Sequence, residues 1–362
     1  MGKVLQVGKI IDGNGNELKN KEIKIKEEKI IEIDDKVKKS EVDTVKNFKD
    51  KIMIPGMIDS HLHYAMNGEP SFEEMFLEES VPFMTLKAVN HARKDLEMGF
   101  TTVRDMGAPG GLALALKDAI NEEHIKGPRI LASGSALSIS SGHGDWYSEW
   151  VDLNEPLSIK ADGKNEVRKA VRKQIHKGAD NIKVMASGGV MDKGSEPGAP
   201  EYSVEEMKVA VKEAEKRGLP TGAHAQGTSS IKNALKAGIS SIDHGIYLDK
   251  EAVKMMKEKE KHLVPTLAAP NRIVEYGTEA GIPEHAVEKS KKVKQRHEES
   301  FKMALNNNVK IAMGTDSGTP FNKHGENAYE LELMVKLGMT EMEAIQSTTK
   351  EPAKLLRIEN KI

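Results

Sequence analysis

Residues 54–337 contain eight short apolar runs, and a stretch with helical periodicity follows each of them. The runs lie at 54–63, 101–107, 129–134, 181–188, 220–226, 240–245, 262–269 and 310–318. The helical stretches lie at 84–98, 111–124, 165–177, 203–217, 228–237, 249–259, 284–307 and 326–337. Apolar strands that alternate with helices are typical of a parallel sheet buried on both faces, and eight such units close a barrel. The sequence therefore predicts an α/β fold, a (β/α)8 barrel of the TIM type.

A different pattern precedes the barrel. Segments within residues 3–50 alternate apolar and polar side chains between turns rich in Gly, Asn and Asp, which predicts a small domain of β-strands. We expect this domain at 1–53, the barrel at 54–356 and a short tail at 357–362. The amino-terminal strands find no β partners near the other end of the sequence, so we expect either a domain built from 1–50 alone or a truncated form. Long loops expected at 135–160 and 270–283 would carry substrate contacts.

Six potential metal ligands stand at or near the ends of the apolar runs. His61 and His63 are separated by one residue on a strand, so both imidazoles point to the same face and can hold one metal ion. Two polar residues on an exposed strand would give the same pattern. Because the active sites of such barrels lie at the carboxyl ends of the strands, we expect all six side chains to converge. The set is His61, His63, Lys183, His224, His244 and Asp316.

Lys183 is the unusual member of this set, because it lies within a strand that should be buried on both sides. Burying an ammonium group without a partner costs much free energy. One interpretation is a lysine that reaches water or pairs with a carboxylate. The other is a neutral lysine that reacts with carbon dioxide, since the resulting carbamate is an anionic ligand able to bridge two metal ions. The sequence leaves both interpretations open.

The remaining histidines give weaker signals. His297-Glu298 begins like the HExxH motif of zinc proteases, but Phe301 occupies the position of the second histidine, and 284–302 is predicted to be a charged surface helix. His143 lies in the Gly-rich loop after the third run, where it is a candidate substrate contact. The histidines expected to be structural are His91, His124, His176, His262 and His285.

The composition excludes several classes of protein. The chain has no cysteine, so disulfides and thiolate metal sites are excluded and any metal must be held by His, carboxylate or a rarer ligand. A net charge of -2 gives no electrostatic footprint for nucleic acid. We recognise no signal peptide and no apolar run of membrane-spanning length, so we expect a cytoplasmic protein without nucleic-acid or membrane partners.

At these motifs the chain resembles the amidohydrolase superfamily of metal-dependent hydrolases. IPGMIDSHLH is similar to the first-strand signature, IKVMASGGV to the lysine segment of the fourth strand, and AHAQG, IDHG and GTDSGTPFNKHG to strands five, six and eight. The chain is most similar to the prolidase-like branch, which includes zinc carboxypeptidases and lies close to imidazolonepropionase-like proteins. The resemblance implies a barrel with a composite, urease-like β-sandwich, which this sequence leaves incomplete at its carboxyl end.

The resemblance also implies a cofactor, two divalent metal ions and specifically zinc. His61 and His63 would bind the first ion with Asp316, and His224 and His244 the second. Carboxylated Lys183, formed from CO2, would bridge them. A metal-bridging hydroxide would attack the scissile amide carbonyl, with Asp316 as general base and then general acid. His143 would steady the developing oxyanion or a substrate carboxylate.

The substrate is predicted less sharply than the reaction. Gln226, Tyr247 and His324 are expected to contact it. Acidic residues in the loops favour a cationic side chain, so we expect a dipeptide or N-acyl amino acid, with a dipeptide ending in Arg or Lys as the leading candidate. Merely solvated carboxylates would look the same. The methionines leave a homo-oligomer possible, although core filling is their commoner use. The acidic loop residues are Asp145, Glu149, Asp192 and Glu196.

Two alternatives remain. A cyclic-amide or imidazolonepropionase-type hydrolase would cleave another C–N bond. The imidazolonepropionase-type enzyme would use one metal ion and would not need Lys183. A non-catalytic barrel scaffold is the second alternative, although such a protein has no need to keep six ligands. The metal stoichiometry separates the first alternative from the binuclear enzyme.

Overall fold

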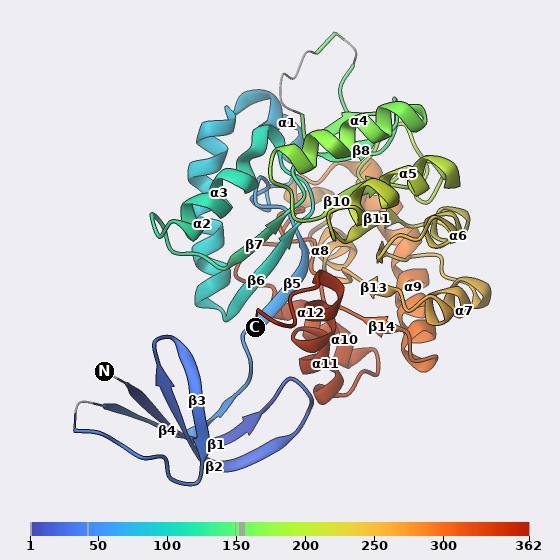
Figure 1. The fold of residues 1–362 in the computed structure, drawn as a ribbon. Coiled ribbons are helices and arrows are strands. Elements are labelled where there is room, and N and C mark those ends of the chain that lie inside the picture. Colours follow the sequence, from blue (N-terminus) through green and yellow to red (C-terminus); the bar gives the residue numbers. More distant parts are fainter. Residues whose placement is uncertain (1, 42, 149, 152–155, 362) are drawn as a thin grey trace.

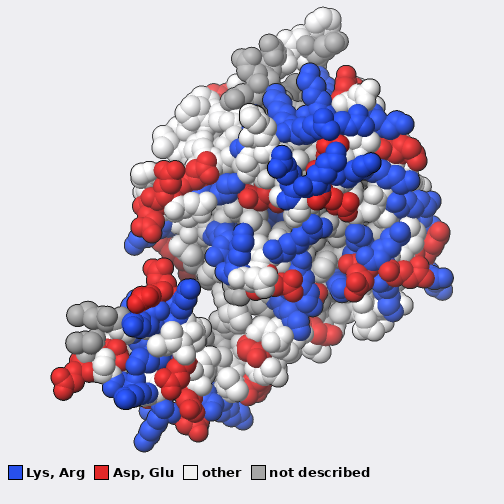
Figure 2. Space-filling model, in the orientation of Figure 1, with Lys and Arg blue, Asp and Glu red and all other residues white. Residues whose placement is uncertain are grey.

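The computed structural model describes residues 2–41, 43–148, 150–151 and 156–361. It consists of a small amino-terminal sheet and a barrel of parallel strands surrounded by helices (Figure 1). Among the described residues, no helix combines the length and apolar character that crossing a membrane requires. Basic and acidic side chains are interspersed over the sheet and the outer helices on the face shown in Figure 2.

The small sheet has the strand order β3-β2-β1-β4. Strand β1 pairs with β2 in the antiparallel direction and with β4 in the parallel direction. The predicted first turn is a hairpin in which the Asp12 carboxylate accepts the backbone N–H groups of Asn14 and Asn16. One face of the sheet buries Val7 and Ile23, whereas β3 is exposed along its whole length. The strands are β1 (Lys3–Ile11), β2 (Glu17–Lys26), β3 (Lys29–Asp34) and β4 (Thr44–Met53).

The barrel contains all eight predicted runs, and its first and last strands close on each other. The N–H of Ser60 donates to the carbonyl of Met313, and the N–H of His63 donates to that of Ser317. The third run forms β7, and a second short strand, β8, follows it after a break. Hydrogen bonding therefore divides the barrel into a sheet β5-β6-β7 and a sheet β14-β13-β12-β11-β10-β8-β9. The strands are β5 (Met57–Leu62), β6 (Phe100–Asp105), β7 (Arg129–Ala132), β8 (Ala136–Ser138), β9 (Ser158–Lys160), β10 (Ile182–Met185), β11 (Thr221–Ala225), β12 (Ser241–His244), β13 (His262–Val264) and β14 (Lys310–Ile311).

The helices follow the strands around the outside of the barrel, and their apolar faces pack on it (Figure 1). Two short 3-10 turns, Pro109–Gly111 and Thr278–Ala280, lie between them. The helices are α1 (Phe72–Glu78), α2 (Val81–Glu97), α3 (Leu112–Asn121), α4 (Gly163–His176), α5 (Val204–Glu215), α6 (Thr228–Ala237), α7 (Lys250–Glu258), α8 (Ala268–Tyr276), α9 (Glu284–Asn306), α10 (Ala328–Lys336), α11 (Glu341–Ser347) and α12 (Lys350–Leu356).

The prediction of a long loop at 270–283 is wrong, because helix α8 and the 3-10 turn Thr278–Ala280 occupy most of that segment. The buried carboxylate of Glu330, on α10, accepts the N–H groups of Leu267 and Ala268 at the start of the helix. These donors are among those that a helix leaves unsatisfied at its amino end. The residue that caps α8 therefore lies more than 60 positions away in the sequence, and local patterns could not reveal it.

Candidate metal centre

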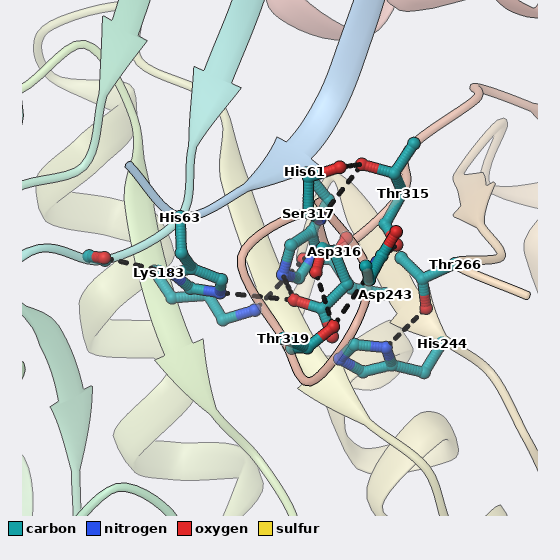
Figure 3. A network of polar contacts seen from close by, with 12 residues as sticks. His61, His63, Lys183, Asp243, His244, Thr266, Thr315, Asp316, Ser317 and Thr319 are labelled. Carbon is teal, nitrogen blue, oxygen red and sulfur yellow. Dashed lines mark hydrogen bonds and ion pairs between the residues drawn. The ribbon is translucent and has the colours of Figure 1, made fainter. Parts of the chain in front are cut away.

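The six predicted ligands line one cavity at the carboxyl end of the barrel strands. His61 comes from β5 and His63 directly follows that strand, whereas Lys183 comes from β10, His224 from β11 and His244 from β12. Asp316 follows the last strand on a loop that reaches back over β5, as Figure 3 shows. Asp316 is partly exposed, and the other five side chains are buried.

The ligand atoms in this cluster face one another. Nε2 of His61 and Nε2 of His63 each lie 3.4 Å from Oδ1 of Asp316. One ligand atom each of His61, His244 and Asp316 lies within 4.8 Å of the others. The ring of His224 lies 4.5 Å from that of His244, measured between centroids. Four imidazoles from the ends of three strands therefore surround a single space, with one carboxylate at its edge.

Outer hydrogen bonds orient the imidazoles. Nδ1 of His63 lies 3.0 Å from the carbonyl oxygen of Gly107, and Nε2 of His224 lies 3.4 Å from that of Gly188. A carbonyl can only accept, so the facing ring nitrogen carries the hydrogen. This leaves the lone pair on Nε2 of His63 and on Nδ1 of His224. Fixing a tautomer in this way is what partners of metal-binding histidines do.

Backbone strain accompanies the ligands. His244 has φ of +71° and Asp316 has φ of +61°, both in the left-handed region. Thr266, which follows β13, has φ of +53°, and its Oγ1 lies 2.7 Å from Nδ1 of His244. A β-branched residue rarely adopts this conformation, and such strain costs about 1–3 kcal/mol per residue. The fold holds these strained residues where their side chains face the cavity. No sequence motif pointed to Thr266.

A second residue that the sequence analysis did not single out, Asp59, links β5 to the loop that carries Asp316. The buried carboxylate of Asp59 accepts the N–H of His61 at 3.0 Å and the hydroxyl of Thr315 at 2.7 Å. It also accepts the side-chain amide of Asn327 at 2.8 Å. These contacts fix the backbone of His61 and also fix Thr315, the residue before Asp316.

The unmodified Lys183 pairs with a carboxylate inside the barrel. This pairing is one of the two possibilities that the sequence left for an unmodified lysine, the other being a side chain that reaches water. Its Nζ lies 3.3 Å from Oδ2 of Asp243, and Nδ1 of His61 lies 3.2 Å from the same oxygen. The fully buried guanidinium of Arg104 donates to Oδ1 of Asp243 at 3.2 Å. Burial lowers the pKa of Lys183, and the attraction of Asp243 only partly offsets this effect. The amine is thereby brought closer to the neutral form that reacts with carbon dioxide.

The protonation states suit a divalent cation. Burial lowers the pKa of His61 to about 4, and it lowers the pKa values of His224 and His244 well below their usual range. Burial alone would raise the pKa of Asp316, but the neighbouring imidazoles of His61 and His63 outweigh it and lower the pKa. Neutral imidazoles with an ionised carboxylate and no thiolate form a donor set that zinc accepts. The residues present therefore fit the implied metal ions.

The cavity itself is narrow, about 70 Å³. Gln226 lines it, and its Oε1 is buried without a hydrogen-bond partner among the residues that the structure describes. His143 also lines it, with its ring centroid 4.0 Å from that of His224. The rest of the wall beyond the ligands is mainly apolar: Met66, Trp146, Leu157, Met185, Val190, Met191, Ile246, Ala269, Pro270 and Ile273.

Two predicted substrate contacts do not belong to this wall. The ring of His324 stacks on those of His91 and Tyr64, and its Nε2 lies 3.1 Å from the carbonyl oxygen of Met66. Its other nitrogen lies 3.2 Å from the Asp95 carboxylate, so His324 supports the segment after β5. Tyr247 is absent from the cavity wall, and its backbone N–H donates to the carbonyl of Gln226.

As far as the structure describes them, the acidic loop residues predicted to favour a cationic substrate do not line the cavity either. Asp192 is buried and turns toward His143, because its carboxylate accepts hydrogen bonds there. Asp145 lies 3.5 Å from Nζ of Lys160, and Glu196 is not part of the cavity wall. Glu149 lies outside the described residues. Within the described part of the chain, Asp316 is the carboxylate that lines the cavity.

His297 corrects a further prediction, because it is buried rather than on a charged surface. It lies on the inner face of α9, where its Nε2 donates to the carbonyl of His244 at 2.9 Å and its ring lines the cavity. Periodicity predicted the helix, but the charged residues around His297 concealed which face is buried.

The comparisons with known proteins agree with this geometry. A model of the amidohydrolase family matches residues 52–362. Ochratoxinase of Aspergillus niger is 32% identical over 369 residues, which cover 96% of this chain and 75% of that protein. The structure of a Xaa-Pro dipeptidase with methionine bound in its active site is 33% identical, with a TM-score of 0.89 over 100% of this chain and 90% of the other. A prolidase complexed with N-methylphosphonate-L-proline is 30% identical, with a TM-score of 0.91 over 100% and 89%.

Proposed function

This chain belongs to the amidohydrolase family and is a hydrolase of amide or peptide C–N bonds, and from that premise we propose a binuclear enzyme that releases an amino acid from a dipeptide or an N-acyl amino acid. The observation that carries this proposal is the convergence of His61, His63, Lys183, His224, His244 and Asp316 on one cavity.

The two ions would be held as the donor set suggests. His61 and His63 with Asp316 would hold one, and His224 and His244 the other, with carboxylated Lys183 between them. When bound, divalent ions such as zinc would lower the pKa of a water molecule and polarise the scissile carbonyl. For Lys183 to take this part, its amine must leave Asp243, which would keep its contact with Arg104.

The side chains of the cavity would transfer protons and form hydrogen bonds with the substrate. Asp316 stands 3.4 Å from two imidazoles at the edge of the cluster, so its ionised carboxylate can accept a proton from the attacking water. The same carboxylic acid would deliver that proton to the leaving amine. Burial would lower the pKa of His143, but the carboxylate of Asp192 outweighs it and raises the pKa. Because Nδ1–H of His143 donates to Asp192, the protonated ring can donate a second hydrogen bond from Nε2 to the developing oxyanion or to a substrate carboxylate. Gln226 would use its unpartnered carbonyl to accept an N–H group of the substrate.

The apolar wall bears on the choice of substrate. An Arg or Lys side chain would find no carboxylate in the described cavity wall except Asp316, which the chemistry requires. Methionine, valine, leucine and isoleucine side chains instead favour an apolar substrate group. The similar Xaa-Pro dipeptidase has methionine bound in its active site, and the similar prolidase is complexed with N-methylphosphonate-L-proline. We therefore favour an apolar amino acid as the released product over Arg or Lys.

A panel of amides tests the proposal. Dipeptides and N-acetyl amino acids ending in Met, Phe, Pro, Arg and Lys would be incubated with enzyme purified without chelator, and the released amine would be quantified. We expect hydrolysis that is lost on chelation and restored by zinc with bicarbonate. We also expect a kcat/KM for the apolar members at least about tenfold above that for Arg and Lys, since one or two buried methylene groups supply that much. Faster cleavage of the Arg and Lys members would contradict the choice of substrate.

One observation favours a second candidate, an imidazolonepropionase-type C–N hydrolase with one metal ion. The unmodified Lys183 already has a partner in Asp243, and His61, His244 and Asp316 alone form a compact three-ligand group. Hydrolysis of cyclic amides with one metal ion per chain, together with no cleavage of the linear panel, would favour this candidate.

A further inference from the structure

A buried carboxylate joins the two loops that cover the cavity. Asp192 lies in the loop between β10 and α5, and it is 5% exposed. Its Oδ2 accepts hydrogen bonds from Nδ1 of His143 at 2.7 Å, and from the N–H of Gly189 and Oγ of Ser195, both at 2.9 Å. Its Oδ1 accepts Nε1 of Trp146 at 2.7 Å. Two of these four donors, His143 and Trp146, come from the other loop, between β8 and β9, and both line the cavity.

We propose that Asp192 is a positioning residue, which holds the His143 imidazole for catalysis and the Trp146 indole for selection of the substrate. The proposal rests on the proposed function, in which His143 acts on the substrate. We call the contact of Asp192 with His143 the His143 arm and its contact with Trp146 the Trp146 arm. The two arms lead to different predictions, because His143 would act on the reacting atoms and Trp146 belongs to the cavity wall around them.

The His143 arm leaves its imidazole little freedom. Nδ1 is held by Asp192, and the backbone N–H of the same residue donates to Oε1 of Glu201 at 2.8 Å. A side chain at Gly189 would place Cβ 2.5 Å from Cε1 of His143, so the ring packs directly on the glycine backbone. Its opposite contact is the ring of His224, with centroids 4.0 Å apart. With Nδ1 committed to a carboxylate, Nε2 is the nitrogen left for the substrate.

The Trp146 arm forms a boundary. Trp146 and Leu157 line the narrow cavity, and both also line a neighbouring cavity of about 1090 Å³ that opens beside the start of α2 and the middle of α4. The indole is anchored to Asp192 on one edge, and it stacks near the ring of Phe76, with centroids 6.2 Å apart. Releasing this anchor would let the two cavities merge, which would loosen the fit of the substrate rather than remove a reacting group.

Two side chains of α9 hydrogen-bond to the backbone of the loop that carries Asp192. The buried Nζ of Lys289 donates to the backbone carbonyls of Asp192 and Ser195, and Nε2 of His285 donates to that of Met191 at 2.9 Å. The loop that carries the carboxylate is therefore fixed to a long helix on the outside of the barrel. A carboxylate anchored in this way can hold its partners in place instead of following them.

The experiment uses the full chain loaded with zinc and the best substrate of the amide panel. Asp192→Ala removes both arms, Asp192→Asn keeps one acceptor oxygen, and Trp146→Phe breaks only the indole arm. Asp162→Asn is the matched control, because this carboxylate anchors the start of the same loop through Ser140 and lies outside the cavity wall. Zinc content, kcat and KM would be measured for each variant.

Tryptophan fluorescence gives a readout that does not depend on turnover. The chain has two tryptophans, and Trp150 is 90% exposed. In a Trp150→Phe background, the emission therefore reports on Trp146 alone. Emission maximum and quenching by acrylamide would be recorded with and without Asp192→Ala, on protein whose thermal unfolding remains cooperative.

We expect Asp192→Ala to lower kcat about 10- to 100-fold with zinc content unchanged, and Asp192→Asn to recover part of the loss. Trp146→Phe should change KM several-fold and kcat little. Asp192→Ala should shift the Trp146 emission to longer wavelength and increase its quenching. Unchanged emission and unchanged kcat in Asp192→Ala would overturn the proposal, as would equal losses in Asp162→Asn. If the parent cleaves no amide, the proposed function fails, and the emission alone decides whether Asp192 positions Trp146.

Discussion

Replacing Asp316 with asparagine separates its proposed role as a proton acceptor from its role as a ligand. Asparagine has the same shape, and its carbonyl oxygen can occupy the position 3.4 Å from Nε2 of His61 and of His63. The backbone also tolerates the change, because φ at this position is +61° and asparagine adopts the left-handed region more readily than most residues. The variant should therefore fold and retain zinc.

The loss expected from Asp316→Asn is catalytic. A positioned general base contributes roughly 100- to 10,000-fold, which corresponds to about 2.7–5.4 kcal/mol of activation free energy. We expect kcat to fall within that range, while KM changes little and zinc per chain stays at the parental value. Steady-state kinetics on the best amide of the panel, with elemental analysis of the same samples, would measure this. A kcat within threefold of the parent, at unchanged zinc content, would refute the assignment of Asp316 as the proton acceptor.

Three further changes probe the site and the fold. Thr266→Val removes the hydroxyl that contacts His244 while keeping a β-branched side chain. Competition with a chelator should show that zinc binds about 10- to 100-fold more weakly. An unchanged zinc affinity would show that Thr266 does not orient His244 for metal binding. Lys183→Met should bind fewer than two zinc ions per chain and lose on the order of 100-fold in kcat, and full activity would refute a bridging lysine. Glu351 lies 3.4 Å from His262 at the other end of the barrel. Burial would raise the pKa of Glu351, but His262 and an adjacent lysine outweigh it and lower the pKa to about 2, from 4.5. Its stabilisation is therefore present above pH 4.5 and is lost as the pH falls toward 2. After allowance for solvent screening it amounts to about 1–2 kcal/mol, so the difference in Tm between the parent and Glu351→Gln should shrink between pH 6 and pH 3, and a constant difference would contradict this.

The barrel and the positions of the six candidate ligands could be predicted from the sequence for a simple reason. Parallel strands buried on both faces need apolar runs, and polar residues such as His61 and Asp316 at the ends of those runs stand out against them. The number of strand–helix units and the end of the barrel that carries the site follow from that contrast. Whether these residues bind metal stays a prediction.

The partners of those residues could not be predicted, because they depend on contacts between distant segments. Asp243 stands beside a candidate ligand in the sequence, yet its role emerges only when β12 brings it to Lys183 and Arg104. The sequence predicts Asp192 as one of the acidic loop residues that would favour a cationic substrate. In the structure its loop folds back so that the carboxylate contacts His143, and the neighbouring residues in the sequence do not reveal this fold. The capping of α8 by Glu330 is a similar case, since helix signals are local and this cap is not.

The number of zinc ions bound per chain tests the binuclear site most directly. Protein purified without chelator, and again after incubation with zinc and bicarbonate, would be examined by elemental analysis and by native mass spectrometry. We expect two zinc ions per chain and the added mass of one carbon dioxide, with both features lost in Lys183→Met. One zinc ion on a chain with unmodified Lys183, or no bound metal after incubation, would contradict the binuclear site.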